Sequence, residues 1–125
     1  MNILLVDDSK VMRNIQKKAL AALGDVTFAE AGDGVEALAV IAQNPGGFSL
    51  MLVDWNMPNM NGLQLISTIR ETDKKTLLIM VTTEAEKERV LEALRAGANN
   101  YMIKPFTPDA LVEKVRGTLA KLRAA

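Results

Sequence analysis

Residues 3–9, Ile-Leu-Leu-Val-Asp-Asp-Ser, place two aspartates directly after a short apolar run. The same order recurs three times further along the chain, where an apolar run ends at Asp54, at Thr82 and at Lys104. Short continuous apolar runs are typical of strands that are buried on both faces, as the strands of parallel sheets are. The repeated pattern therefore predicts a parallel sheet with polar groups at its strand ends.

These strand ends predict a single polar site. In an open parallel sheet, ligands bind in the crevice at the carboxyl ends of the strands. If the four runs are neighbours, Asp7, Asp8 and Asp54 meet a hydroxyl from Thr82 and an ammonium from Lys104. Neighbouring carboxylates repel one another unless a cation or proton offsets their charge. Mg²⁺ prefers oxygen ligands of this kind, and a carboxylate beside it is suited to accept a phosphoryl group.

Strand and helix patterns alternate from end to end, which predicts one domain spanning residues 1–125. Five parallel strands joined by right-handed helical crossovers give a doubly wound α/β sandwich of three layers. The expected strands cover residues 2–6, 26–29, 49–53, 77–81 and 100–103. The expected helices, with their caps, cover residues 9–23, 33–43, 62–71, 83–97 and 107–122.

Four helix starts carry residues suited to N-capping. Ser9 and Thr107 are single caps, and Pro108 after Thr107 suits the first helical position. Asp33–Glu36 and Thr83–Glu86 have the spacing of a capping box. Since Thr83 serves as a cap in this interpretation, Thr82 is free to donate a hydrogen bond to a phosphoryl oxygen.

Three expectations concern burial. Trp55, the only tryptophan, is expected to be partly exposed, and Tyr101, the only tyrosine, is expected to be half-buried at a sheet edge. The first helix is expected to bury one apolar face, made of Met12, Ile15, Ala19, Ala22 and Leu23.

Composition excludes several kinds of chemistry. The chain has no cysteine and no histidine, so catalysis by a thiolate or an imidazole is excluded. Fifteen basic and fifteen acidic residues give zero net charge, which argues against nucleic acid or an anionic membrane surface as a partner. An apolar run of about 18 residues, as a spanning helix needs, is missing. With a strand beginning at residue 2 or 3 and no signal peptide before it, we expect a cytoplasmic protein.

The motifs resemble those of response-regulator receiver domains over the whole chain. The resemblance rests on Leu4–Ser9, Val53–Pro58, Thr82 and Lys104–Phe106, which occur in the order typical of that family. The loop at residues 54–62 is similar to that of the single-domain chemotaxis members. The resemblance implies a flavodoxin-like sheet with strand order 2-1-3-4-5.

The resemblance also implies a chemical role for each site residue. Asp54 is the expected phosphoacceptor, which takes the phosphoryl group from a phosphohistidine on a partner kinase. Asp8, Asp54 and the backbone carbonyl of Asn56 are expected to bind Mg²⁺, and Asp7 acts mostly through a bound water. Lys104 and Thr82 are expected to contact the phosphoryl group. Such a protein is a signalling receiver that catalyses only its own phosphorylation and dephosphorylation.

A switch follows from the same resemblance. Thr82 moves toward the phosphoryl group, Tyr101 rotates inward, and the face made by the fourth helix, the fifth strand and the fifth helix rearranges. Tyr101 and Lys114 are the expected partner-face residues. Asn56 and Glu84 occupy positions that tune the lifetime of the phosphoform, and we expect that lifetime to be short.

The expected partners are a histidine kinase, a flagellar motor switch protein and a phosphatase, acting on a monomer. A receiver in a phosphorelay or another circuit is the first alternative. A Mg²⁺-dependent phosphatase of the haloacid dehalogenase type is a second, although its motif needs an aspartate where Asn56 stands. A flavodoxin-like binding module is a third, although the acidic residues would repel a flavin phosphate.

Overall fold

The computed structural model describes residues 1–124, with side chains as far as Lys121, as five parallel strands and five α-helices that alternate along the chain. The sheet order is β2-β1-β3-β4-β5, as the resemblance predicted. The strands are β1 (Asn2–Val6), β2 (Thr27–Ala31), β3 (Leu50–Val53), β4 (Leu77–Thr82) and β5 (Asn100–Ile103). The helices are α1 (Lys10–Leu20), the short 3-10 helix η1 (Ala21–Leu23), α2 (Gly34–Ala42), α3 (Gly62–Arg70), α4 (Lys87–Ala96) and α5 (Pro108–Ala124).

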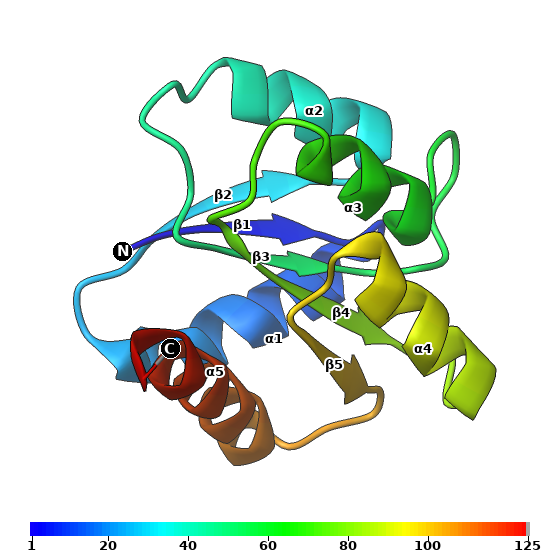
Figure 1. The fold of residues 1–125 in the computed structure, drawn as a ribbon. Helices are drawn as coiled ribbons and strands as arrows, with labels where there is room; N and C mark the ends of the chain where they lie inside the picture. The colour runs from blue at the N-terminus through cyan, green and yellow to red at the C-terminus, as the bar shows by residue number, and fades with distance from the viewer. Residues whose placement is uncertain (125) are drawn as a thin grey trace.

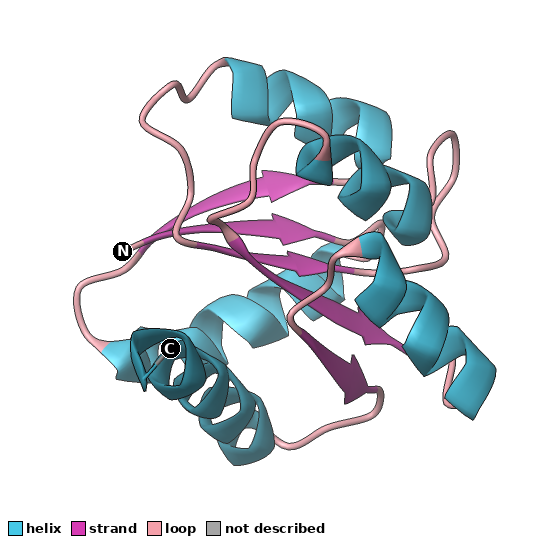
Figure 2. Ribbon diagram, in the orientation of Figure 1, coloured by secondary structure: helices cyan, strands magenta, loops and turns pink. Residues whose placement is uncertain are grey.

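Helices cover both faces of the sheet (Figure 1), with α2, α3 and α4 on one face and α1 and α5 on the other. The strands form the middle of three layers (Figure 2). Successive side chains of a strand point to opposite faces, so Met51 and Val53 of β3 join the core under α3, while Leu50 and Leu52 join the core under α1 and α5. The central strands are therefore buried on both sides.

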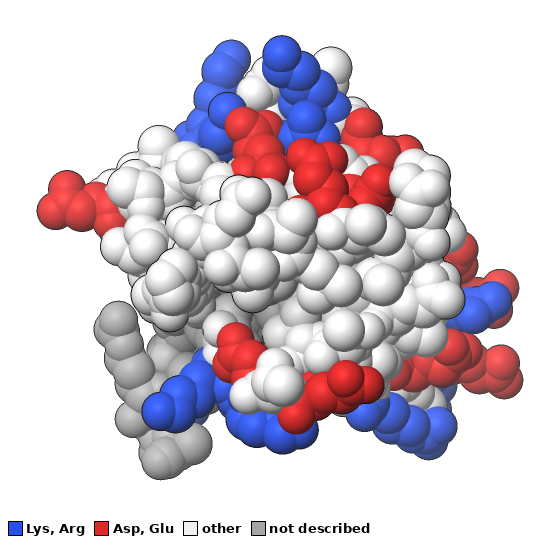
Figure 3. All heavy atoms as spheres, turned by 90° about the horizontal axis from the view of Figure 1, so that it is seen from above, with Lys and Arg blue, Asp and Glu red and all other residues white. Residues whose placement is uncertain are grey.

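The outer face over α2, α3 and α4 has a broad uncharged middle, with acidic and basic side chains gathered along two of its borders (Figure 3). Among the residues that the structure describes, no helix is both long enough and apolar enough to cross a membrane.

The register of the strands brings their polar ends together. Val6 pairs with Val53, which pairs with Met80, and Thr82 pairs with Ile103. The ladder continues one residue further, because Asp54 N donates to the Val6 carbonyl (2.9 Å) and Lys104 N donates to the Thr82 carbonyl (2.8 Å). The chain thus turns away from the sheet at the same edge in each case.

The helix starts follow the predicted caps in three of four cases. Ser9, Asp33 and Thr107 each accept a hydrogen bond from the first turn of the helix that follows. The box at Asp33 is incomplete, because the Glu36 carboxylate accepts from Gly32 N (3.1 Å) and not from the cap residue itself.

The predicted capping box at Thr83 is wrong. Helix α4 begins at Lys87, and its N-cap Glu86 makes no side-chain capping bond. One local and one tertiary contact accompany the late start: Glu84 N donates to the Thr82 hydroxyl two residues earlier (3.3 Å), and the Glu84 carbonyl accepts from the Tyr101 hydroxyl of β5. Both main-chain groups of Glu84 are therefore engaged outside a helix.

The predicted buried face of α1 is also partly wrong. Ile15 is 40% exposed and Ala22 is exposed, whereas Gln16 and Leu20 are buried. The buried stripe follows positions 16, 19 and 20, of which Ala19 and Leu20 belong to the core between the sheet and the helices α1 and α5. Because the stripe begins with the polar residue Gln16, apolar spacing alone does not indicate it.

Both ends of the described chain lie at the edge of the sheet where the strands begin (Figure 1). The Met1 ammonium donates to the Asp25 carbonyl (3.0 Å) in the turn before β2, and α5 runs back toward the same edge.

Candidate functional site

Three carboxylates meet at the carboxyl edge of the sheet. Asp7 and Asp8 follow β1, and Asp54 follows β3, which is the neighbouring strand. One carboxylate oxygen from each lies within 4.8 Å of the other two. Asp7 is 1% exposed and Asp54 is 8% exposed, whereas Asp8 is exposed to solvent. The cluster that the strand ends predicted is therefore formed, with one side open.

Lys104 brings a positive charge to this cluster from the end of β5. Its Nζ lies 2.8 Å from Asp7 Oδ2 and 3.5 Å from Asp54 Oδ1, and its side chain is 13% exposed. The Lys104–Pro105 peptide bond is cis. Three ionised carboxylates and one ammonium leave an excess of negative charge in the site. A bound cation would offset that excess.

Burial raises the pKa of the Asp54 carboxyl from 3.8 to about 6. The Lys104 charge opposes this rise in pKa, and the charges of Asp7 and Asp8 add to it. Burial thus makes the ionised form of Asp54 less stable in the folded protein than it would be in water. A cation that binds beside this carboxylate would stabilise the ionised form.

Asp54→Asn is expected to stabilise the protein in the absence of metal, and the gain should depend on pH. An unfolded aspartate has a pKa near 3.8 and the folded one about 6, so the folded state binds the proton more tightly. Stability is therefore lost as the pH rises from 3.8 to 6, by about 2–3 kcal/mol in all. In urea unfolding, Asp54→Asn should have a higher free energy of unfolding than wild type at pH 7.5, and the two proteins should be about equally stable near pH 4.

Exposed Asp25 supplies the control for this experiment, because Asp25→Asn removes a carboxylate outside the site. Equal gains in the two variants at pH 7.5 would contradict a special penalty at Asp54.

The donor set fits Mg²⁺. All three acidic groups offer carboxylate oxygens, which hard divalent cations prefer, and the exposed Asp8 leaves room for the waters that Mg²⁺ retains. The expected third protein ligand, the carbonyl of Asn56, follows Asp54 by two residues. The Asn56 side chain donates to Glu84 Oε1 (3.4 Å) in the segment between β4 and α4, so the two predicted lifetime-tuning residues are in contact.

Thr82 and Tyr101 are joined through Glu84. Thr82 is fully buried, and its hydroxyl accepts from Glu84 N, which leaves its own hydrogen to be donated elsewhere. Tyr101 is only 7% exposed and donates to the Glu84 carbonyl. Burial, with the nearby Glu84 charge, raises the pKa of Tyr101 to about 12.

The expectation that Tyr101 lies at a sheet edge is confirmed, because β5 is the last strand of the sheet, but the expectation of half-burial is wrong, because the residue is buried. Its ring already lies inward, packed in the core that faces α4. The partner-face role of Tyr101 and Lys114 stays a prediction; Tyr101 is buried, and Lys114 on α5 is half-buried. Lys114 borders a shallow hollow of about 440 Å³ together with Asn100, Ala110, Glu113, Gly117 and Lys121.

Trp55 is buried as well, contrary to the expectation of partial exposure. It is 6% exposed, and the Arg89 guanidinium of α4 lies over its ring, 5.5 Å from the centroid. Since Trp55 directly follows Asp54, this cation–π contact links α4 to the segment that carries Asp54. Nothing in the sequence pattern indicated the partner, because the two residues come from separate elements.

The loop between β3 and α3 is closed tightly behind Asp54. Gly62 N donates to the Trp55 carbonyl (2.9 Å), and a Cβ built on Gly62 would lie 2.1 Å from the Asp54 carbonyl oxygen. Asn61 caps α3 in a complete capping box. Asn59 has φ +67° and its amide donates to Asp33 Oδ2 (2.8 Å) at the start of α2.

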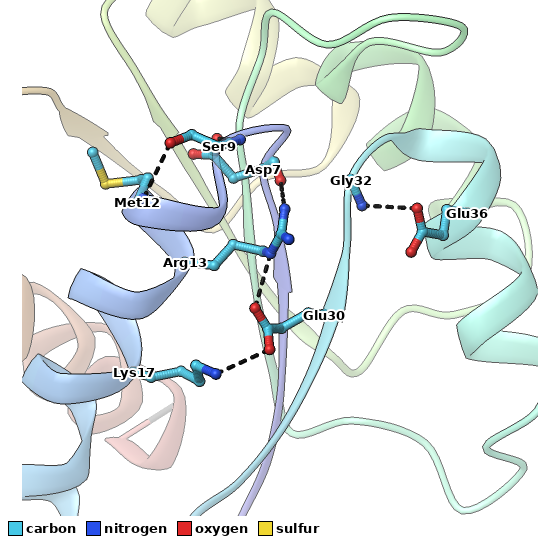
Figure 4. A network of polar contacts seen from close by, with 8 residues as sticks. All are labelled: Asp7, Ser9, Met12, Arg13, Lys17, Glu30, Gly32 and Glu36. Carbon is cyan, nitrogen blue, oxygen red and sulfur yellow. Dashed lines mark hydrogen bonds and ion pairs between the residues drawn. The ribbon is translucent and has the colours of Figure 1, made fainter.

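A network that the sequence analysis missed lies on the other side of the cluster (Figure 4). Arg13 of α1 donates both to the Asp7 carbonyl and to the Glu30 carboxylate of β2, and Lys17 donates to the second Glu30 oxygen. Arg13 and Lys17 are one helical turn apart. That spacing was the available signal, but it has meaning only once Glu30 is known to face α1.

Comparison with known proteins gives one consistent result. The sequence matches the family model of the response regulator receiver domain over residues 3–116. It is 46% identical over 121 residues to the chemotaxis protein CheY1 of Helicobacter pylori, covering 95% of this chain and 97% of that protein. It is 43% identical over 117 residues to the chemotaxis protein CheY of Pseudomonas aeruginosa, covering 92% and 93%.

A solved structure agrees with these sequence matches. The fold is similar, with a TM-score of 0.89 and 26% identity, to a chain in the CheX–CheY–BeF3–Mg²⁺ complex of Borrelia burgdorferi. The match covers 95% of this chain and 89% of that one.

Proposed function

The chain belongs to the response regulator receiver family, and from that premise we propose that Asp54 accepts a phosphoryl group in a Mg²⁺-dependent reaction. The observation that carries the proposal is the placement of Lys104 Nζ, 2.8 Å from Asp7 and 3.5 Å from Asp54, within a cluster of three carboxylates. The ammonium lies beside the oxygen that would become phosphorylated, so it can contact the incoming group without a large movement.

Asp8, Asp54 and the Asn56 carbonyl would hold Mg²⁺, with Asp7 acting through a bound water. When bound, the cation neutralises charge on the phosphoryl oxygens and on the carboxylates around them. Lys104 already bridges Asp7 and Asp54, and this bridge keeps two buried carboxylates close together before a cation arrives.

The phosphoryl donor is a phosphohistidine of a histidine kinase. A carboxylate oxygen of Asp54 forms the new bond to phosphorus as the P–N bond to the imidazole breaks, and the imidazole takes a proton from solvent. Lys104 then contacts one phosphoryl oxygen, and the Thr82 hydroxyl donates to another. Both groups come from strand ends, so they are held by the sheet itself.

Glu84 would transmit the change at the phosphorylation site, because its main-chain groups contact both Thr82 and Tyr101. If Thr82 donates its hydroxyl hydrogen to the phosphoryl group, any movement of that hydroxyl is passed to Glu84, because Glu84 N donates to the same oxygen and the Glu84 carbonyl accepts from the Tyr101 hydroxyl. The phosphoryl group thus makes contacts in only one of two arrangements of this segment, which shifts the population toward that arrangement. Because Tyr101 already lies inward, the change concerns how α4 and β5 are held more than the direction of the ring.

The circuit we favour is chemotaxis, with the flagellar motor switch as the target, in the cytoplasm. Its support is that the two relatives described above, at 46% and 43% identity, are named as chemotaxis proteins. The target would bind the face of α4, β5 and α5, which includes Lys114, and a phosphatase would limit the signal. A phosphorelay uses the same site, and transfer of the phosphoryl group onward to a histidine phosphotransferase domain would favour that circuit.

The proposal is tested by adding Mg²⁺ and then acetyl phosphate while the fluorescence of Trp55 and the intact mass are followed. We expect a first change with Mg²⁺ and a second with acetyl phosphate, together with a mass gain of one phosphoryl group that disappears when the donor is removed. Asp54→Asn should keep its fold and show no mass gain. A folded wild type that gains no mass with Mg²⁺ and donor present would refute the proposal.

A further inference from the structure

Arg13 connects three elements at the back of the acidic cluster (Figure 4). From α1, its Nη1 donates to the main-chain carbonyl of Asp7 at the end of β1, and its Nε donates to Glu30 Oε1 of β2 at 2.9 Å. The Arg13 side chain is only 16% exposed. Two nitrogens of the rigid, planar guanidinium thus bind both the end of β1 and the strand β2.

Glu30 is in turn a fixed anchor for Arg13. Its second carboxylate oxygen accepts from Lys17 Nζ at 3.0 Å. The hydrogen bonds from Lys17 and then Arg13 lower the pKa of Glu30 below its usual range, so the carboxylate stays ionised at neutral pH. The guanidinium is therefore held in one orientation from the side away from the cluster.

The carbonyl that Arg13 holds belongs to the peptide bond between Asp7 and Asp8. The Asp7 side chain has other restraints, from Ser9 N (2.9 Å) and from Lys104 (2.8 Å). Asp8 differs: it is exposed, and among the residues that the structure describes its side chain makes no hydrogen bond or ion pair. Its direction is therefore set by the backbone to which it is attached.

We propose that Arg13, anchored by Glu30, is a positioning residue for Mg²⁺, which fixes the Asp7–Asp8 peptide so that the Asp8 carboxylate faces Asp54. The inference rests on the proposed function, since it concerns the same metal. Groups that orient metal ligands by hydrogen bonds change metal affinity by about 10–100-fold when they are removed. Arg13 would act at a distance from the cation, through the main chain.

Charge and geometry predict opposite results, which makes the test sharp. Removing a positive charge near the cluster should by itself strengthen Mg²⁺ binding. Loss of the fixed peptide should weaken it. In Arg13→Gln we expect the Mg²⁺ dissociation constant to rise about tenfold. Arg13→Lys should also weaken binding although it keeps the charge, because one ammonium does not reproduce the rigid fork that spans the Asp7 carbonyl and Glu30.

The dissociation constant is measured by Trp55 fluorescence and, independently, by the rise of the melting temperature with Mg²⁺ concentration. Lys18→Gln is the matched control, because it removes the same charge from an exposed position of the same helix without touching Glu30 or Asp7; it should stay within about twofold of wild type. In an Asp8→Asn background, Arg13→Gln should cause little further loss, since residues that act as one unit are not additive.

The outcomes separate the two hypotheses. If both Arg13 variants bind Mg²⁺ as tightly as wild type and differ only by a lower melting temperature in the absence of metal, the Arg13 contact is purely structural. That result would overturn the inference about Arg13 and leave the proposed function standing. A full additional loss in the Asp8→Asn background would also overturn it, because Arg13 would then act elsewhere. A wild type that binds no Mg²⁺ would overturn the proposed function as well.

Discussion

Gly62→Ala is expected to lower the free energy of unfolding by about 3 kcal/mol, the upper end of the usual cost of overpacking. The added methyl group would lie 2.1 Å from the Asp54 carbonyl oxygen and 3.0 Å from the Trp55 Cα. Both are main-chain atoms, which cannot rotate aside as a flexible side chain can. The loop must move or the helix must start later, and either change displaces the residue that we propose to be phosphorylated. Urea unfolding monitored by circular dichroism measures the loss.

Gly117→Ala is the matched control for this substitution. Gly117 lies inside α5, and a Cβ built there meets nothing within 4 Å. Alanine is favoured over glycine within a helix, so this variant should gain about 0.5–1 kcal/mol. If Gly62→Ala were as stable as Gly117→Ala, the close approach of the loop to Asp54 would not be required by the fold.

Lys104→Met is expected to destabilise the metal-free protein by about 3 kcal/mol at pH 7.5, because removing one partner of a buried ion pair leaves the other charge uncompensated. Here two carboxylates lose their cation, Asp7 at 2.8 Å and Asp54 at 3.5 Å. This loss of stability should be smaller under two conditions. Below pH 6 the Asp54 carboxyl takes up a proton, since its pKa is already about 6 with Lys104 present, and at neutral pH added Mg²⁺ should replace the missing charge.

The measurement is thermal or urea unfolding at pH 7.5 and pH 5, with and without Mg²⁺. Exposed Lys75 provides the control, and Lys75→Met should change stability by less than about 0.5 kcal/mol under all conditions. A loss in Lys104→Met that is independent of both pH and Mg²⁺ would mean that Lys104 contributes by packing, and that its charge has little to do with the carboxylates.

The sheet and the acidic cluster were predictable because their signal is local. A strand buried on both faces must be apolar throughout, so the polar residue that ends it is visible in the sequence, as Asp7, Asp54 and Lys104 are. The strand order, in contrast, came from the resemblance to a family. Spacing alone predicts five parallel strands without saying which ones are neighbours.

The errors share one cause, which is competition between local signals and tertiary contacts. Thr83 and Glu86 have the spacing of a capping box, but Thr82 and Tyr101 take the main-chain groups of Glu84 and delay the helix. Gln16 is polar and yet buried, so the true face of α1 is not an apolar stripe. The contact between Tyr101 and Glu84 joins residues that are 17 apart in the chain, so it cannot be read from neighbouring residues.

The same reasoning explains why Arg13 and Arg89 escaped notice. A basic residue on a helix is ordinarily a solvated surface group, and only the folded chain shows that Arg13 reaches the Asp7 carbonyl or that Arg89 covers Trp55. These two contacts lie on opposite faces of the sheet, on either side of the acidic cluster. Sequence patterns locate the groups that carry the chemistry, and the structure is needed to find the groups that hold them in place.

The position of the two chain ends has a practical consequence for anyone who builds a sensor from this protein. Both lie at the edge where the strands begin, and a strand of five residues separates that edge from the acidic cluster by roughly 15 Å. A dye, a bead or a fluorescent protein attached at either end would leave the opposite rim open to small phosphodonors and to the proposed kinase. Immobilisation through the termini is therefore compatible with real-time recording of the phosphoryl uptake that we propose.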